Sequence, residues 1–194
     1  MCTSALVVEV SAAEPVVADL RRRFDASASL GVPTHITLLF PFMSPAEITS
    51  NVIRHIESAL SLVPAFDFSL TQIGRFPATT YLTPDPVEPF VALTTALVER
   101  FPQYRPYGGV HDGTVPHLTV AHGDAATANS AATALEERLR ILEPIRTRCS
   151  SVSLLENSSG RWKQMRVFDL LSFPRFFAFQ RSRVMQRSPW SAEL

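Results

Sequence analysis

The sequence has few cysteines, no net charge and no long apolar stretch, and each absence argues against a class of protein. Its two cysteines, Cys2 and Cys149, lie far apart in the chain, which disfavours a structural disulfide and fits a reducing, cytoplasmic compartment. The 18 basic and 18 acidic residues balance, so we expect no large electrostatic footprint on nucleic acid. No apolar run reaches the roughly 18 residues that span a bilayer, and the N-terminus lacks a signal-peptide pattern.

Metal-binding patterns are also missing, because no cysteine and histidine residues have the spacing of zinc ligands. We therefore expect neither a metal nor a cofactor. What the chain does have is length and apolar content: 194 residues, of which 46% are hydrophobic, can form one compact domain. We predict a single domain over residues 1–171 and a basic, aromatic tail of unassigned role over residues 172–194. We expect a monomer.

The most informative feature is a His-apolar-Thr-apolar motif that occurs twice, as HITL at residues 35–38 and as HLTV at residues 117–120. Both copies lie in short runs that are typical of a β-strand, in which successive side chains point to opposite faces. The histidine and threonine of each copy then share one face, and the two apolar residues share the other. We predict that the polar faces line a cleft while the apolar faces are buried in the core.

The order of predicted elements indicates an internal repeat. Strands are predicted at 5–10, 35–40, 66–73, 79–83, 117–121, 145–155 and 162–170, and helices at 14–24, 44–62, 90–101 and 125–142. A motif strand followed by a helix and two strands occurs over residues 35–83 and again over 117–170. Two similar halves about a pseudo-twofold axis would place both motif strands side by side, with the helices outside. The predicted fold class is therefore α+β, with two lobes of antiparallel sheet and a central cleft.

Two imidazoles combined with two hydroxyls suit chemistry at phosphorus. The pKa of histidine, near 6.5, allows one ring to accept a proton from the attacking water while the other donates a proton to the leaving alkoxide. The threonine hydroxyls can donate hydrogen bonds to the non-bridging phosphate oxygens and stabilise the charge that develops there. We refer to His35, Thr37, His117 and Thr119 as the tetrad.

With these motifs the chain resembles the two-histidine (2H) phosphoesterase superfamily, which includes 2′-5′ RNA ligases and cyclic phosphodiesterases. That superfamily is marked by two His-x-Thr/Ser-apolar motifs, one in each lobe. The wider stretches HITLLFPF at residues 35–42 and VPHLTVAHG at residues 115–123 resemble its extended motifs. The Gly-Arg-Trp sequence at residues 160–162 is also similar, and the resemblance covers roughly residues 5–170.

The resemblance implies that the tetrad is catalytic and that it hydrolyses a cyclic phosphodiester without a metal. The expected substrate is a 2′,3′-cyclic nucleotide or an RNA end that carries a cyclic phosphate. Two alternatives remain open, namely a binding module that has the same fold without turnover, and a 2′-5′ RNA ligase. All four motif residues are retained, which favours the enzyme, and the neutral charge favours a small substrate over a long RNA. The sequence does not determine which histidine is the base.

Aromatic and basic residues outside the motifs are candidates for substrate binding. Tyr107, Phe42 and Phe76 could stack on a base, and Arg75 could contact a second phosphate. Burial in the core is the competing interpretation for the two phenylalanines, and a solvated surface position is the competing interpretation for the arginine.

Two further features have plainer interpretations. The Arg21–Arg23 run fits a solvated helix C-terminus, where cations oppose the helix dipole, better than it fits a phosphate site. His122 follows the second motif, and strand alternation predicts that it faces away from the tetrad.

Overall fold

The computed structural model describes residues 2–109 and 114–172 of the chain. The predicted tail lies, apart from Ser172, outside these residues.

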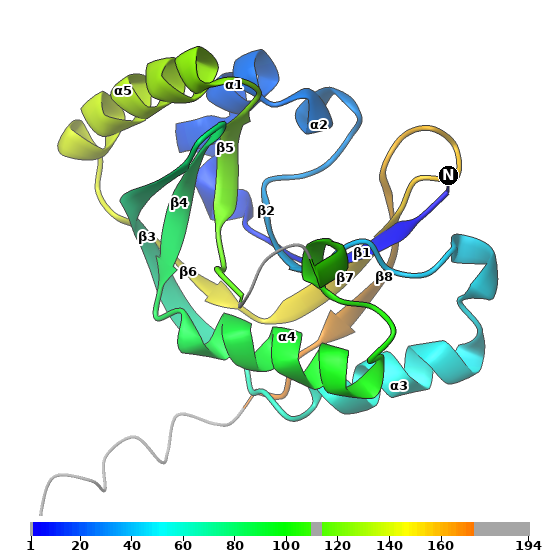
Figure 1. Cartoon of the computed structure of the whole chain (residues 1–194). Helices are drawn as coiled ribbons and strands as arrows, with labels where there is room; N and C mark the ends of the chain where they lie inside the picture. Colours follow the sequence, from blue (N-terminus) through cyan, green and yellow to red (C-terminus); the bar gives the residue numbers. More distant parts are fainter. Residues whose placement is uncertain (1, 110–113, 173–194) are drawn as a thin grey trace, which may run out of the picture.

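One eight-stranded antiparallel sheet forms the centre of the molecule (Figure 1). Its strands are β1 (Ser4–Glu9), β2 (His35–Leu39), β3 (Phe66–Phe76), β4 (Thr79–Asp85), β5 (Leu118–His122), β6 (Ile145–Cys149), β7 (Ser151–Glu156) and β8 (Lys163–Asp169). Their order across the sheet is β6-β3-β4-β5-β2-β1-β7-β8. The two motif strands, β2 and β5, are therefore central neighbours with three strands on either side, an order that is compatible with two related halves.

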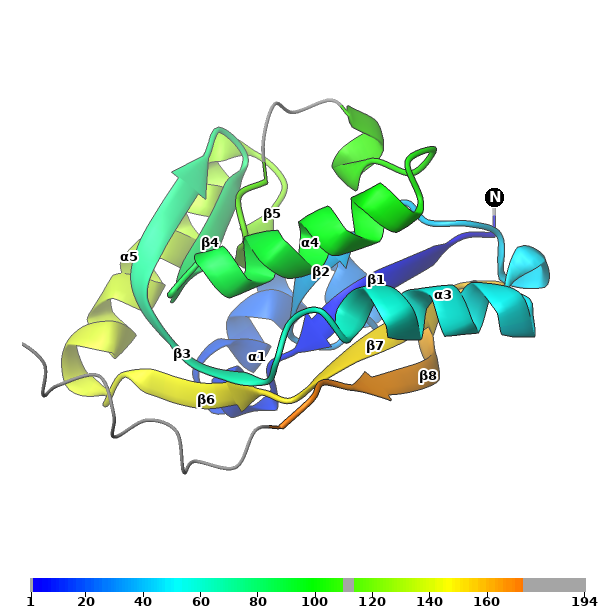
Figure 2. The same ribbon diagram turned by 90° about the horizontal axis from the view of Figure 1, so that it is seen from below.

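The helices lie outside the curled sheet in two groups (Figures 1 and 2). The structure contains α1 (Glu14–Phe24), α2 (Ala26–Ser29), α3 (Ser50–Leu60), α4 (Glu88–Arg100) and α5 (Ala125–Ile141), with short 3-10 turns η1 (Ser11–Ala13), η2 (Pro45–Glu47) and η3 (Pro106–Gly109). Helices α1 and α5 pack against each other and against β5, whereas α3 packs on α4, which in turn packs on β2. Each motif strand thus contacts its own helices. The position of the helices outside the sheet agrees with the sequence prediction.

The predicted helix over residues 44–62 is interrupted. Ser44 and Glu47 form a capping box around η2, but this turn ends after three residues. A second start follows, in which the backbone of Thr49 is extended and its hydroxyl accepts a hydrogen bond from the backbone N–H of Val52. Thr49, a good N-cap residue, therefore begins α3 as a separate helix.

The predicted strand over residues 145–155 is two strands that belong to opposite halves of the sheet. β6 pairs with β3, whereas β7 pairs with β1. The alternation of buried and less buried residues in β6 ends at the exposed Ser150, and every residue from Val152 to Glu156 in β7 is buried. The two strands that follow the first motif, β3 and β4, likewise join the half that contains the second motif strand. The halves of the fold are therefore not contiguous in sequence, in contrast to the predicted repeat.

Both motif strands carry the same irregularity directly after the threonine. Two consecutive apolar residues are buried there, Leu38–Leu39 in β2 and Val120–Ala121 in β5, and the pairing with the neighbouring strand shifts register. A bulge of this kind changes which face the following side chains occupy. His122 consequently pairs with Thr79 on the same face of the sheet as Thr119, so the prediction that it faces away from the tetrad is wrong.

Candidate active site

The tetrad lies on the face of the two central strands that is turned away from the apolar core. The apolar residues of both motifs, Ile36, Leu38, Leu118 and Val120, are almost fully buried. The four tetrad residues alternate with them and are half-buried. This is the division of faces that the period-two pattern predicts, and it leaves two imidazoles and two hydroxyls accessible from one side of the sheet.

A backbone carbonyl two residues earlier accepts a hydrogen bond from each imidazole. Nδ1 of His35 lies 2.8 Å from the carbonyl oxygen of Pro33, and Nδ1 of His117 lies 2.7 Å from that of Val115. A carbonyl oxygen only accepts hydrogen bonds, so Nδ1 must carry the proton in both rings. Both neutral rings are then left with an unprotonated Nε2, which in His35 lies 3.1 Å from the hydroxyl oxygen of Thr37.

Burial and a nearby cation keep His35 neutral. Burial is the main cause that lowers the pKa of His35 to about 4, and the positive charge of Arg21 acts in the same direction. The carbonyl of Pro33 and the carboxylate of Asp25 oppose this shift only in part. At neutral pH the ring of His35 is therefore uncharged and able to accept a proton.

The cation behind His35 comes from the arginine run that we interpreted as a solvated helix end. That interpretation holds for the exposed Arg22 and Arg23, but Arg21 is only 3% exposed. Its guanidinium forms a 3.0 Å ion pair with the buried Asp25 and donates a hydrogen bond to the hydroxyl of Thr34, the residue before the first motif. Arg21 is therefore a structural group inside the protein.

Three aromatic rings surround His117. Its ring centroid lies 5.1 Å from that of Tyr81, 5.4 Å from that of Phe76, which is nearly perpendicular to it, and 6.2 Å from that of Tyr107, which is stacked on it. Burial lowers the pKa of His117, although the hydrogen bond to Val115 opposes this shift. The sequence analysis missed Tyr81, whose place at the site depends on the pairing of β4 with β5.

Tyr107 connects the two halves of the site. Its backbone N–H donates a 2.6 Å hydrogen bond to the carbonyl of Phe40, at the end of β2, and its phenol is hydrogen-bonded with Thr37. Its ring at the same time stacks on His117 of the second motif. The side chain remains 38% exposed, so it can still contact a ligand. The structure thus places this candidate beside the tetrad.

Of the other substrate-binding candidates, one lies at the site and two do not. Phe76 reaches the site and is 39% exposed, so its core interpretation does not hold. Phe42 is only 4% exposed and packs edge-on against Phe101, which places it in the core and offers no surface to a substrate. Arg75 turns toward α5, where it forms a 2.7 Å ion pair with Glu136, and it does not point toward the tetrad.

An aromatic pair, Phe40 and Trp162, lies beside the first motif strand and was not among the residues predicted from the sequence. Phe40 and Trp162 meet edge-to-face with centroids 5.9 Å apart. Both pack against a small buried cluster of Ala5, Val7 and Leu155. Because Val7 pairs with Thr37 across β1 and β2, this cluster lies on the same face of the sheet as the tetrad. The Gly-Arg-Trp sequence at residues 160–162 could have indicated this pair, because it contains Trp162.

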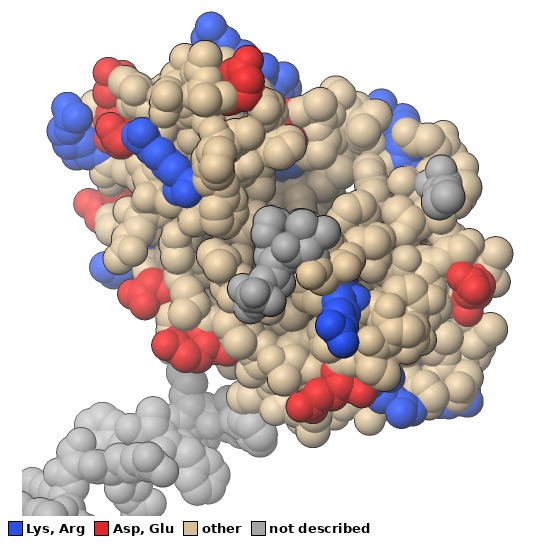
Figure 3. Space-filling model, viewed as in Figure 1, with Lys and Arg blue, Asp and Glu red and all other residues tan. Residues whose placement is uncertain are grey.

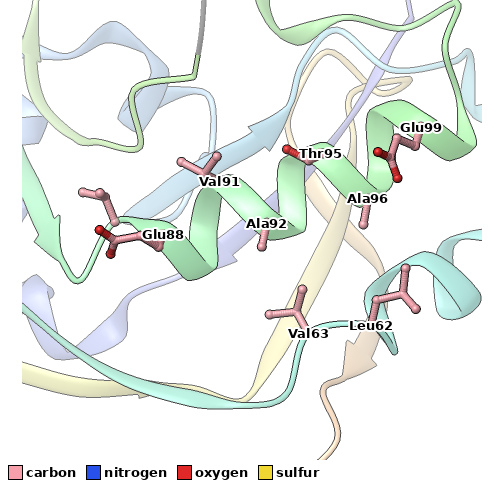
Figure 4. A pocket seen from close by; sticks show the side chains of 9 residues that line it. Leu62, Val63, Glu88, Val91, Ala92, Thr95, Ala96 and Glu99 are labelled. Carbon is pink, nitrogen blue, oxygen red and sulfur yellow. The ribbon is translucent and has the colours of Figure 1, made fainter.

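A separate groove runs along α4 (Figure 4). Its volume is about 460 Å³, and its lining is largely apolar, with Glu88 and Glu99 from α4. No tetrad residue lines it, and its two carboxylates would repel a phosphate.

Neither a metal centre nor a membrane-spanning helix is found in the part of the chain that the structure describes. Over residues 2–109 and 114–172, no three His, Cys, Asp or Glu side chains gather as metal ligands would. Over the same residues, no helix is both long enough and apolar enough to cross a bilayer.

Solved structures with a similar fold exist. E. coli LigT complexed with 3′-AMP is 13% identical, with 87% of this chain and 97% of that chain covered and a TM-score of 0.55. TT0787 of Thermus thermophilus is 16% identical, with 88% and 98% covered and a TM-score of 0.54. A structure described as a phosphoesterase is 15% identical, with 88% and 99% covered and a TM-score of 0.55. No curated protein matches the chain.

The curled antiparallel sheet with its outer helices has an α+β fold similar to that of LigT. The family follows from the sequence itself, because the model of the 2′-5′ RNA ligase superfamily matches residues 8–161. The chain therefore belongs to the 2′-5′ RNA ligase superfamily of 2H phosphoesterases.

Proposed function

We propose that the protein hydrolyses a cyclic phosphodiester, either a 2′,3′-cyclic nucleotide or a cyclic phosphate at an RNA end, with the tetrad as its catalytic group and without a metal. The observation that carries this proposal is the matched pair of His-x-Thr strands. Both histidines are held in one tautomer by a backbone carbonyl; His35 begins β2, and His117 directly precedes the adjacent central strand β5. Two histidines in the same tautomer on one face of the sheet can supply the base and the acid for chemistry at a single phosphorus.

In the proposed reaction, Nε2 of one neutral histidine takes a proton from a water molecule while the oxygen of that water bonds to phosphorus. The bond from phosphorus to one ester oxygen of the ring breaks, and the second histidine, as an imidazolium, protonates that oxygen. We assign proton acceptance to His35, because its burial and the nearby Arg21 favour the neutral ring. His117 then acts as the donor, and the anionic phosphodiester between the rings helps it to take up a proton on binding.

The threonines bind the phosphate in this proposal. Thr37 and Thr119 share the face of the histidines, so their hydroxyls can donate hydrogen bonds to the non-bridging oxygens. Such donors are most effective where they are held in place before the reaction. The hydroxyl of Thr37 is held in place by its contacts with Nε2 of His35 and the phenol of Tyr107. Its one proton points to Nε2 in the empty site, so it turns to the phosphate when the substrate binds.

The surface charge supports a small substrate. On the face shown in Figure 3, most lysine and arginine side chains lie toward the edge of the molecule, with aspartates and glutamates near them. No continuous basic band crosses this face between the described residues, as a long RNA would require. The exposed aromatic rings of Phe76 and Tyr107 instead suit one or two bases. LigT, which has a similar fold, has been crystallised with the nucleotides 3′-AMP and ATP, and this supports the proposal of a small substrate.

Hydrolysis of the four nucleoside 2′,3′-cyclic monophosphates in the presence of EDTA tests the proposal. The wild-type protein is compared with the His35→Ala/His117→Ala double variant. We expect turnover by the wild type alone, and the isomer of the product identifies the ester oxygen that leaves.

Two results would overturn parts of the proposal. Loss of wild-type activity in EDTA would contradict the metal-independent mechanism. Binding of these nucleotides without turnover, measured by calorimetry, would instead support a binding module of the same fold.

A further inference from the structure

The two catalytic halves hold their histidines by different means. His35 is oriented by hydrogen bonds at both ring nitrogens, to Pro33 and to Thr37. Among the described residues, the ring of His117 forms one hydrogen bond, from Nδ1 to the carbonyl of Val115. Its Nε2 forms none with Thr119, in contrast to the contact between His35 and Thr37. One hydrogen bond leaves a ring free to swing about its own axis, so the contacts of the aromatic rings must restrain His117.

Tyr81 is the ring best placed to do so. It extends from β4 opposite Thr119 of β5 and lies 5.1 Å from His117, the shortest centroid distance of the three rings. Phe76 lies 4.5 Å from Tyr81 and 5.4 Å from His117, and therefore supports both. Burial raises the pKa of the Tyr81 phenol, so this side chain is neutral wherever the histidines titrate.

Gly74 makes room for the ring of Tyr81. The two residues pair across β3 and β4, and the ring lies against the glycine backbone. A Cβ atom at position 74 would lie 2.1 Å from Cε2 of Tyr81 and 2.6 Å from its hydroxyl oxygen. Contacts this short are not tolerated, so any residue larger than glycine displaces the ring. Glycine inside a strand often marks such a close approach.

We propose that Gly74 and Tyr81 form a positioning device that fixes the imidazole of His117 for proton transfer. Tyr81 acts through His117 and is not itself a catalytic residue. Gly74 acts indirectly, through Tyr81, because it determines where the ring of Tyr81 lies. The proposal rests on the catalytic role of His117, but its structural part can be tested without any substrate.

Nitrogen-15 NMR of the histidine rings in the full chain is the first test. We compare the wild type with Tyr81→Leu, Tyr81→Phe and Gly74→Ala, and assign the signal by its loss in His117→Ala. In the wild type and in Tyr81→Phe, which keeps the ring, His117 should be a single tautomer with the proton on Nδ1. In Tyr81→Leu and Gly74→Ala it should become a mixture of tautomers, and its pKa should move up toward 6.5 as water enters. The signal of His35, the other motif histidine, should change less.

A double-mutant cycle separates positioning from general damage. If Gly74→Ala acts by displacing the ring, it should have little further effect on the His117 signal when Tyr81 is already leucine. Phe66→Leu supplies a matched control, because Phe66 lies at the other end of β3 and packs on Phe90, away from the tetrad. It should reduce thermal stability without changing the His117 signal. An unchanged tautomer in folded Tyr81→Leu and Gly74→Ala would overturn the proposal.

Kinetics with a cyclic nucleotide supply the second measurement. Tyr81→Leu and Gly74→Ala should lower kcat by about 10- to 100-fold, the order of loss that accompanies a misplaced catalytic group. KM should change by less than about threefold, and Tyr81→Phe should restore kcat. If the wild type turns over no cyclic nucleotide, the proposed activity fails, while the NMR result still decides the positioning role. A loss confined to KM would instead assign Tyr81 to substrate binding and overturn the positioning role.

Discussion

Ile36 of β2 pairs with Leu118 of β5, and this pair joins the two halves of the sheet. Because the strands are antiparallel, the residues that flank this pair cross over: His35 lies toward Thr119, and Thr37 lies toward His117. Each histidine is thus placed next to the threonine of the other motif. The contacts of Tyr107 with both Thr37 and His117 agree with this arrangement. A phosphate over the pair would have one imidazole on each side, as in-line displacement requires.

Replacement of either motif histidine should abolish turnover without unfolding the protein. We expect His35→Ala and His117→Ala each to lower kcat by about 100- to 10,000-fold, the usual contribution of general acid–base catalysis. His55→Ala on α3 is the matched control and should retain full activity. Steady-state kinetics and thermal melts measure both effects. Activity near that of the wild type in either motif variant would refute the two-histidine mechanism.

The exposed rings should govern substrate affinity. Phe76→Ala and Tyr107→Ala should raise KM for a cyclic nucleotide by about 5- to 150-fold, since stacking of a base on an aromatic ring contributes roughly 1–3 kcal/mol. Arg75→Ala should leave KM unchanged, because its guanidinium is paired with Glu136 on α5. Phe42→Ala should chiefly lower stability, by roughly 3–5 kcal/mol, as expected for a buried ring. A selective rise of KM in Arg75→Ala would restore that residue as a phosphate contact.

The buried ion pair behind the first motif should be costly to break. Arg21 and Asp25 are both buried, so Asp25→Asn leaves a guanidinium without its countercharge. We expect this change to lower the free energy of unfolding by roughly 3–5 kcal/mol. The double variant Arg21→Met/Asp25→Asn should recover part of the loss, because it removes the uncompensated charge. Urea denaturation measures both. Equal stability of the single variant and the wild type would show that the pair is not maintained in solution.

The sequence predicts the local features of the site well and its long-range features poorly. The alternation within HITL and HLTV correctly divides buried from half-buried residues, because the period of a strand is a local property. The positions of Tyr81 and Phe76 beside His117 depend on the pairing of β4 with β5, and local patterns do not determine that pairing. Arg21 was misassigned for the same reason, since its burial depends on the distant Thr34 as well as on Asp25.

Two irregularities of the strands explain the remaining errors. The buried pair Val120–Ala121 inserts a bulge that brings His122 onto the tetrad face, against simple alternation. At the exposed Ser150 the chain passes from one half of the sheet to the other. The residue types alone mark neither place, since Val120–Ala121 continues an apolar run and Ser150 is followed by another serine. The pairing of the strands is needed to recognise both.

The pH dependence of activity should follow the two histidine environments. His35 must be neutral to accept a proton, so kcat/KM should rise as the pH increases through about 4, the pKa of His35. His117 must be charged to donate a proton, and its pKa is lowered from 6.5, so kcat/KM should fall as the pH rises through a value below 6.5. We therefore expect a bell-shaped profile with its maximum on the acidic side of neutrality. A profile that rises steadily from pH 4 to pH 9 would contradict these roles.

The same two rings should make the folded protein less stable in acid. Their pKa values are lower in the folded protein than the 6.5 of an unfolded chain, so the unfolded state binds more protons between these values. The free energy of unfolding is then fully retained above pH 6.5 and decreases as the pH falls from 6.5 toward 4, by up to about 3 kcal/mol for His35. Urea denaturation at pH 7 and pH 4.5 measures the decrease. This decrease in the free energy of unfolding should be smaller in His35→Ala than in the wild type. An equal decrease in both would show that the pKa of His35 is the same in the folded and the unfolded protein.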